Sequence, residues 1–222
     1  MLGQVLAAEN HVRDEGTDED PSINHIAVMG MGEPFDNYDN LACFLRLLHD
    51  EKGRNMSYRN MTVSTSGIVP VIERFGEDFP QVNLAISLHR LTDEGRSRIM
   101  PVNRKYPLDM LLEAAERYTD KTHRRITFEY ALISGENDSD EDVNLMIKRL
   151  GGMLCHVNLI PLNKVVERKL FGTSRADAYK VQQQLEDLHI SATVRREMGA
   201  DIDGACGQLR RRAIKEKDRE ET

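Results

Sequence analysis

The chain has 222 residues, of which 40% are hydrophobic and 30% are charged, and its formal net charge is −7 at pH 7. A chain of this size can bury one substantial core, and nothing in its composition requires a second domain. The acidic balance excludes a protein coated in basic residues for indiscriminate nucleic-acid binding. Because the sequence holds neither a signal peptide nor an apolar run long enough to cross a bilayer, we expect a cytoplasmic protein with no membrane segment.

Helices and strands are predicted to alternate along the chain. The first segment, 1–11, has the pattern of a helix, and the acidic segment 13–21 is predicted to be a solvated loop. Amphipathic stripes predict helices over 40–49 and 108–118, and capping sequences predict two more that begin after Ser139 and Ser174. Apolar, β-branched segments predict six strands, which span 23–29, 60–65, 82–88, 125–133, 156–160 and 190–194.

This alternation predicts an α/β fold with a parallel sheet, because parallel neighbours need a long connection and a helix supplies it. The chain begins on a helix rather than on a strand. A strand–helix repeat that begins in this way implies a further strand upstream, so we expect a sheet that lacks its first strand.

Small or polar residues gather where the predicted strands end. In barrel-like α/β proteins, the carboxyl ends of the strands form the functional face. Each group taken alone is more often a turn or a helix cap, so the prediction of a ligand site depends on their joint occurrence. The groups are Gly32 and Glu33 after the first strand, Ser64–Thr65–Ser66–Gly67 at the second, Ser87–Leu88–His89 at the third and Asn163 after the fifth.

The three cysteines are odd in number and far apart in sequence, so we expect free thiols rather than disulfides. Cys43 and Cys155 lie among apolar residues and are predicted to be small core side chains. Cys206 lies in a polar tail with Gly204 and Gly207 close to it, where flexibility lets a thiol reach a site. Cys206 is therefore the candidate reactive thiol.

Seven segments of this chain, in order, resemble the radical S-adenosylmethionine methyltransferases that modify C2 of adenine in ribosomal RNA, the RlmN/Cfr family. The resemblance implies a partial (β/α)6 radical-SAM barrel over 1–198 and a catalytic-cysteine tail over 199–222. It also implies S-adenosylmethionine and a [4Fe-4S] cluster as cofactors. The segments are MGMGEPFDNYDN, MTVSTSG, VNLAISLH, RSRIMPVNRKYPL, RRITFEYALISGENDS, CHVNLIPLN and DIDGACGQLR.

Carried over to this sequence, the family pattern puts Gly32 and Glu33 at the methionyl amino group of the cofactor. A carboxylate with backbone carbonyls at a strand end suits an ammonium group. Hydrogen bonds to the cofactor's carboxylate, ribose and adenine are implied for Ser64, Ser87, Leu88, His89 and Asn163.

In the resembling enzymes, the cysteine that matches Cys206 is methylated by one cofactor molecule. A radical made from a second one then activates that methyl group for addition to adenine C2. The implied partners are ribosomal RNA, in some members transfer RNA, and an electron donor such as flavodoxin.

The cluster motif Cys-x-x-x-Cys-x-x-Cys is absent from this sequence, and three widely spaced cysteines cannot imitate it. Because thiolates hold such clusters, we expect that this chain alone cannot reduce S-adenosylmethionine. Two alternatives stay open, which are a non-catalytic remnant that binds RNA or cofactor and, less favoured, an ordinary metabolic α/β-barrel enzyme.

RNA contact is predicted from local basic clusters, which can grip phosphates in an acidic protein. The paucity of aromatic residues argues against a stacking platform, so a target adenine would have to be extruded into the barrel mouth. The clusters are Arg210, Arg211, Arg212, Lys215, Lys217 and Arg219 in the tail, Arg96, Arg98, Arg104 and Lys105 around Asn103, and Arg124 with Arg125.

Overall fold

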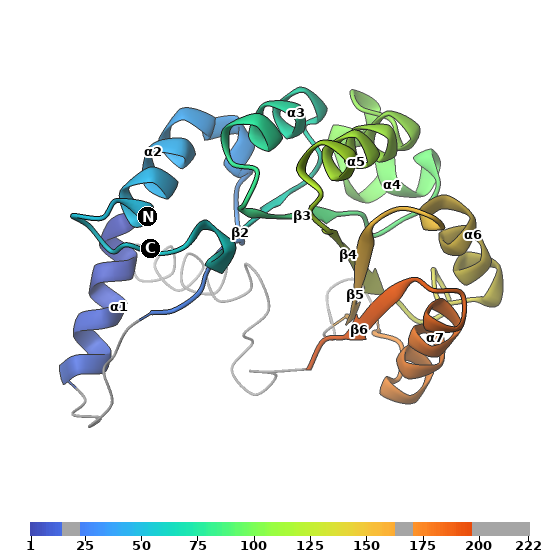
Figure 1. The fold of residues 1–222 in the computed structure, drawn as a ribbon. Helices are drawn as coiled ribbons and strands as arrows, with labels where there is room; N and C mark the ends of the chain where they lie inside the picture. The colour runs from blue at the N-terminus through green and yellow to red at the C-terminus, as the bar shows by residue number, and fades with distance from the viewer. Residues whose placement is uncertain (15–22, 163–170, 197–222) are drawn as a thin grey trace, which may run out of the picture.

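The computed structural model describes residues 1–14, 23–162 and 171–196, and Figure 1 shows their fold. Six strands form one parallel sheet in the order β1-β2-β3-β4-β5-β6, so each strand pairs with its neighbour in sequence and β1 and β6 form the two edges. The strands are β1 (Ile26–Val28), β2 (Met61–Thr65), β3 (Asn83–Ser87), β4 (Ile126–Leu132), β5 (Cys155–Pro161) and β6 (Ser191–Val194).

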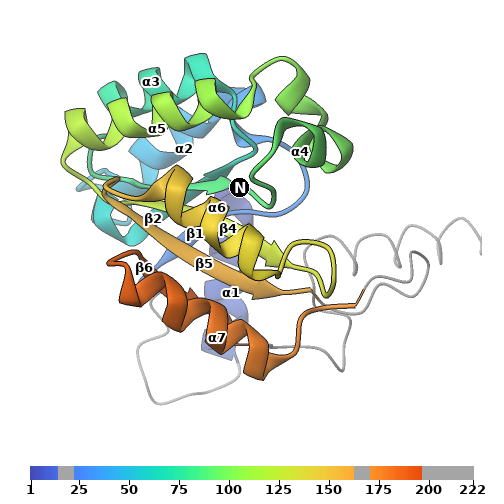
Figure 2. The ribbon, with the colours of Figure 1, turned by 90° about the vertical axis from the view of Figure 1, so that its right-hand side faces the viewer.

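Helices connect the strands and lie along one side of the sheet. Figure 1 shows α2 to α7 following one another around the outer side of the curved sheet, and Figure 2 shows the same layers after a quarter turn. The α-helices are α1 (Leu2–Asp14), α2 (Tyr38–His49), α3 (Val69–Asp78), α4 (Asp93–Ile99), α5 (Leu108–Thr122), α6 (Asp140–Leu150) and α7 (Arg175–Asp187). The short 3-10 helices are η1 (Pro34–Asn37), η2 (Tyr58–Asn60) and η3 (Pro101–Arg104).

These elements confirm the predicted α/β class, all six predicted strands and the five predicted helices. The segment predicted to be a solvated loop is corrected in part, because Arg13 and Asp14 extend α1. The rest of that segment, Asn163 and the tail 199–222 lie outside the described residues. A strand ahead of α1 stays a prediction.

The helix-covered face of the sheet is apolar. Side chains alternate between the two faces of a strand, and β2 shows this as strict alternation between buried and half-buried residues. The buried set of the central strands forms the core with the helices, and each member is at most 1% exposed. It consists of Met61, Val63, Leu84, Ile86, Ile126, Phe128, Tyr130, Val157 and Leu159.

The opposite face of the sheet is polar. Strand pairing aligns its side chains in rows, because partners in register point to the same side. One row runs Ser64, Ala85, Thr127, His156 and Ser191. The next row toward the carboxyl ends runs Ser87, Glu129, Asn158 and Thr193. A sheet that is apolar on one side and polar on the other leaves the polar side for a ligand or for other chain segments.

Within the described ranges, none of the helices combines the length and the apolar content that crossing a bilayer requires.

Candidate functional site

The loop after β1 brings a carboxylate to the carboxyl edge of the sheet. The backbone φ is 120° at Gly30 and 100° at Gly32, values that residues with a Cβ rarely adopt. This turn directs the half-buried Glu33 toward the end of β2. Glu33 also caps η1, since its Oε1 accepts from the backbone N–H of Phe35 at 3.0 Å.

The Glu33 carboxylate is saturated by donors from this chain. Besides the Phe35 bond, Oε1 accepts from the Thr65 hydroxyl at 2.8 Å. Oε2 accepts from both the backbone N–H and the hydroxyl of Ser66, each at 2.6 Å. Because a carboxylate offers about four lone-pair sites, an incoming amino group would have to displace one of these donors.

Backbone carbonyls are the open acceptors of the same loop. Among the described residues, no group donates a hydrogen bond to the carbonyls of Gly30, Met31 or Gly32. Gly32 is also solvent-exposed. The arrangement suits a ligand that carries an ammonium group, with Glu33 holding the loop in shape.

A buried arginine joins the ends of β2 and β3. The Arg96 side chain on α4 is fully buried, and its Nη2 donates to the carbonyls of Ser66 at 2.6 Å and Ser87 at 3.0 Å. Its Nε donates to the Leu88 carbonyl at 3.3 Å, and its Nη1 to Oδ1 of Asn103 at 3.0 Å. Burial lowers the pKa of Arg96 from 12.5 to about 10, so the group stays charged at neutral pH. The guanidinium group thus donates to four oxygen acceptors, and these bonds fix the spacing between the ends of β2 and β3.

His89 presents a neutral imidazole at the end of β3. Its backbone φ is 57°, in the left-handed region. Burial, with the nearby charges of Arg96 and Arg90, lowers the pKa of His89 from 6.5 to about 4. Its Nδ1 accepts from the backbone N–H of Ala131 at 3.1 Å. The proton of the neutral ring is therefore on Nε2, which leaves one donor for a ligand.

Sequence reasoning missed two polar side chains beside His89. Asn137 donates from Nδ2 to the carbonyls of His89 at 3.2 Å and Ala131 at 2.8 Å. Its Oδ1 accepts from the Ile133 N–H at 2.8 Å. Arg90 pairs with Glu136 at 2.6 Å. No spacing motif marks such residues, because they bind backbone groups that come together only in the folded chain.

The structure brings most of the predicted ligand residues to one edge. Ser64 and Ser87 are half-buried on the polar face of adjacent strands, and His89 follows Ser87. Leu88 is fully buried, with its N–H donating to the Glu129 carbonyl at 2.9 Å. Leu88 can therefore contribute only packing here. Asn163 and Cys206 lie outside the described residues.

The predicted core position is confirmed for Cys155 and wrong for Cys43. Cys155 is buried, which raises the pKa of its thiol to about 11. Cys43 is exposed on α2, contrary to the prediction, because the apolar stripe at Leu41, Leu45 and Leu48 faces the core on the other side of the helix.

The described residues do not fit an iron–sulfur cluster. A [4Fe-4S] cluster needs several thiolates in one place, whereas the described cysteines are one on α2 and one at the start of β5. Across the described ranges, no three His, Cys, Asp or Glu side chains group to hold a metal ion.

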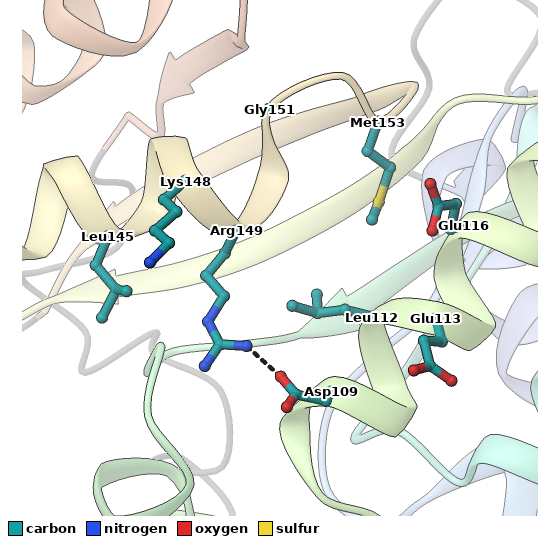
Figure 3. A pocket seen from close by; sticks show the side chains of 9 residues that line it. All are labelled: Asp109, Leu112, Glu113, Glu116, Leu145, Lys148, Arg149, Gly151 and Met153. Carbon is teal, nitrogen blue, oxygen red and sulfur yellow. Dashed lines mark hydrogen bonds and ion pairs between the residues drawn. The ribbon is translucent and has the colours of Figure 1, made fainter.

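Two hollows lie away from this edge. A hollow of about 540 Å³ lies between α5 and α6, where Arg149 pairs with Asp109 (Figure 3). A second, of about 440 Å³, lies at the amino ends of β3 and β4 and includes Arg124 and Arg125. These two arginines precede β4, so the structure does not bring them to the carboxyl edge where we placed the ligand.

The basic cluster around Asn103 divides into two parts. The prediction that Arg96 contacts RNA is wrong, because no part of this residue is exposed. Arg98, Arg104 and Lys105 are exposed. The tail cluster from Arg210 to Arg219 lies outside the described residues.

The profile of the radical SAM superfamily matches residues 14–147 of this chain. The chain is 48% identical over 217 residues to proteins of Bacillus mycoides and Bacillus thuringiensis named "Probable dual-specificity RNA methyltransferase RlmN". The match covers 98% of this chain and 60% of each relative, so the chain spans about three fifths of their length.

Solved structures give the same picture. A radical SAM methyltransferase from Sphaerobacter thermophilus superposes with a TM-score of 0.87 at 46% identity, over 94% of this chain and 60% of the other. Streptococcus suis SuiB, solved bound to S-adenosylmethionine, superposes with a TM-score of 0.59 at 13% identity, over 85% of this chain and 42% of the other. The second likeness supports the fold alone.

Proposed function

Because this chain belongs to the radical SAM superfamily, we propose that it is the S-adenosylmethionine-binding part of an RNA adenine C2-methyltransferase. Its substrate is proposed to be ribosomal RNA, with transfer RNA as a second substrate, in the cytoplasm. The observation that carries this proposal is the 48% identity to the RlmN relatives over 98% of the chain. The carboxyl edge described above belongs to that matched length.

The proposed cofactor pocket uses the groups left open at the carboxyl edge. The carbonyls of the Gly30–Gly32 loop would accept hydrogen bonds from the amino group of S-adenosylmethionine. The hydroxyls of Ser64 and Ser87 would bind polar oxygens of the same cofactor. His89 would donate from Nε2 as a neutral ring, which avoids placing a second cation beside a sulfonium ion. Asn163 stays a predicted contact.

Cys206 is proposed as the residue that carries the methyl group to the adenine. A covalent carrier is required because adenine C2 is electron-poor and does not accept a methyl cation directly. When bound, the cluster and S-adenosylmethionine would supply the radical chemistry. The described residues give that cluster no ligands, so we derive no step through it.

The test is methyl transfer by a chimera in which this chain follows the amino-terminal part of the Bacillus mycoides relative. We expect anaerobic, reduced chimera to transfer label from methyl-labelled S-adenosylmethionine to 23S ribosomal RNA, and Cys206→Ser to abolish transfer. Cys43→Ser is the matched control, because that thiol is exposed on α2. A chimera without activity, or one that keeps activity with Cys206→Ser, would contradict the proposal.

The alternative of a non-catalytic remnant rests on one observation, the absence of the cluster motif. It predicts that the chain binds S-adenosylmethionine or RNA and that the chimera stays inactive. The chain alone, incubated anaerobically with iron and sulfide, should develop no cluster absorption under either hypothesis. Visible absorption bands from a bound cluster would contradict both hypotheses, because each expects that the cysteines of this chain cannot hold a cluster.

A further inference from the structure

We propose that the segment 93–105, which we call the α4–η3 platform, is a rigid docking surface for the RNA phosphate backbone at the rim of the cofactor pocket. The inference rests on the proposed function and names the part of the described chain that would contact the substrate. The inference depends on a contrast within the platform, whose inner charged groups are hydrogen-bonded to the strand ends while its outer cations are exposed to solvent.

The inner side of the platform is bonded to the strand ends that carry the site. Arg96 binds the carbonyls of Ser66, Ser87 and Leu88, as described above. Its partner Asn103, 2% exposed, donates to Oδ1 of Asp93 at 2.8 Å. This network leaves the platform little freedom to move against β2 and β3.

Asp93 completes the anchoring of the platform. Its Oδ1 also accepts from the backbone N–H of Leu108 at 2.7 Å, which ties the platform to the start of α5. The bonds from Leu108 and Asn103 lower the pKa of Asp93, so the carboxylate is ionised and committed to them at neutral pH. The Thr92 hydroxyl accepts from the Gly95 N–H at 3.2 Å and starts α4.

The outer side of the platform carries three exposed cations that form no ion pair with the described residues. In the described part of the chain, no carboxylate lies within ion-pair distance of Arg98, Arg104 or Lys105. Counting Arg96, the platform holds four cations against Asp93 and Glu94, a net +2, in a chain of net −7. Local positive charge of this kind attracts a polyanion.

Several exposed cations on the helical layer form ion pairs. Arg117 pairs with Glu73 at 2.8 Å, Lys121 pairs with Glu77 at 2.7 Å and Lys180 pairs with Asp177 at 2.7 Å. These three cations are neutralised by neighbours, whereas the three platform cations form no ion pair with a described residue. Lys105 Nζ lies 5.3 Å from the centroid of the Tyr106 ring, which leaves its charge without a carboxylate partner in the described ranges. Figure 2 shows α4 on the side of the sheet toward which the β4 and β5 arrowheads point.

The platform position matches the need of the proposed reaction. A base must leave its stack to reach a pocket at the strand ends, and phosphate contacts fix the position of the nucleic acid without reading its sequence. A rigid basic surface beside the Ser87–His89 strand end would hold the backbone next to the pocket that receives the base.

The test compares RNA binding by the 222-residue chain and two triple variants with equal charge change. The platform triple is Arg98→Gln, Arg104→Gln and Lys105→Gln. The control triple is Arg117→Gln, Lys121→Gln and Lys180→Gln on α5 and α7, three cations that are paired with carboxylates. The probe is a fluorescein-labelled RNA hairpin with an adenosine in its loop, and binding is followed by anisotropy as a function of salt concentration.

We expect the platform triple to weaken RNA binding about tenfold near 0.1 M salt and to lower the slope of log Kd against log salt by about 2 to 3. The control triple should change the Kd by less than about threefold, because it removes the same net charge from a surface that lies away from the platform. Both triples should unfold at the temperature of the parent chain.

Three results would overturn the platform. They are an unchanged Kd for RNA in the platform triple, an equal loss of RNA affinity in both triples, and a lower melting temperature of the platform triple that accounts for its loss. An unchanged Kd for RNA together with lost affinity for acidic flavodoxin would assign the cations to the electron donor. The methyl-transfer chimera tests the proposed function separately. If the chimera that carries the platform triple binds and methylates RNA with the Kd and rate of the parent chimera, the proposed RNA-binding role of the platform is refuted. The proposed methyltransferase function would still stand.

Discussion

Charged side chains at the carboxyl edge of the sheet and on its outer helices are held in opposite ways. Glu33 and Arg96 each make four hydrogen bonds, three of which go to the ends of strands, and Arg96 is wholly buried. Arg117 and Glu73 form an ion pair in which each side chain is about half exposed, at 53% and 51%. The edge charges define distances between strand ends, and the outer charges mainly keep a surface solvated. Substitutions at the two places should therefore differ in size and kind.

The largest expected effect is at Arg96. Arg96→Met should lower the free energy of unfolding by ~3–5 kcal/mol, because it leaves three backbone carbonyls and Asn103 buried without their donor. Urea unfolding followed by circular dichroism measures this. Arg96→Lys should recover part of the loss. A loss below about 1 kcal/mol for Arg96→Met would show that the edge is no more dependent on its charges than the outer layer.

A pH effect is expected from His89. Its pKa is about 4 in the folded chain against 6.5 for the ordinary group, so between these values the unfolded chain binds more protons. Stability from this group is full above pH 6.5 and falls as the pH drops toward 4, by up to about 3 kcal/mol at ~1.4 kcal/mol per pKa unit.

The His89 effect is isolated by a matched variant. His89→Asn keeps an acceptor in the place of Nδ1 and tolerates the left-handed backbone. Subtracting its unfolding free energies from those of the parent at each pH cancels the titration of the other ionisable groups. A difference that stays constant between pH 4 and 6.5 would contradict the lowered pKa.

A smaller loss is expected at Glu33. Glu33→Gln keeps an oxygen for the Phe35 and Thr65 donors but places an NH₂ group against the two Ser66 donors. The expected cost is ~1–3 kcal/mol of unfolding free energy, together with weaker S-adenosylmethionine binding in equilibrium dialysis. Thr65→Val removes one of the four bonds and should cost less. Normal stability with lost cofactor binding would instead indicate direct contact by the carboxylate.

The smallest effect is expected on the outer layer. Arg117→Gln should change the unfolding free energy by less than about 1 kcal/mol, because exposed ion pairs are screened and their ordering costs entropy. Urea unfolding at low and high salt tests this, and any loss should shrink as salt rises. A loss comparable to that of Arg96→Met would remove the contrast between the two regions.

The strand ends show how far sequence reasoning reached. Periodicity and turn residues located all six described strands, because burial of alternate side chains leaves a local pattern. The polar groups of Glu33, Ser64 and His89 were found because each lies at, or a few residues after, the carboxyl end of a strand. Arg96 was misread as a surface cation, because a basic residue in a basic cluster carries no local mark of burial. Cys43 was misread because its apolar neighbours occupy the opposite side of the helix.

The sequence by itself determined the α/β order, the parallel sheet and the candidate residues at its carboxyl edge, since these follow from short-range pattern and from motifs. Only the tertiary structure decided which of those residues are still open to a ligand. The packing of the sheet saturates the Glu33 carboxylate with donors at the end of β2, places Arg96 between two strand ends and puts the proton of His89 on Nε2. The physical reason is that hydrogen-bond partners 30 or more residues apart in sequence are chosen by the packing of the sheet.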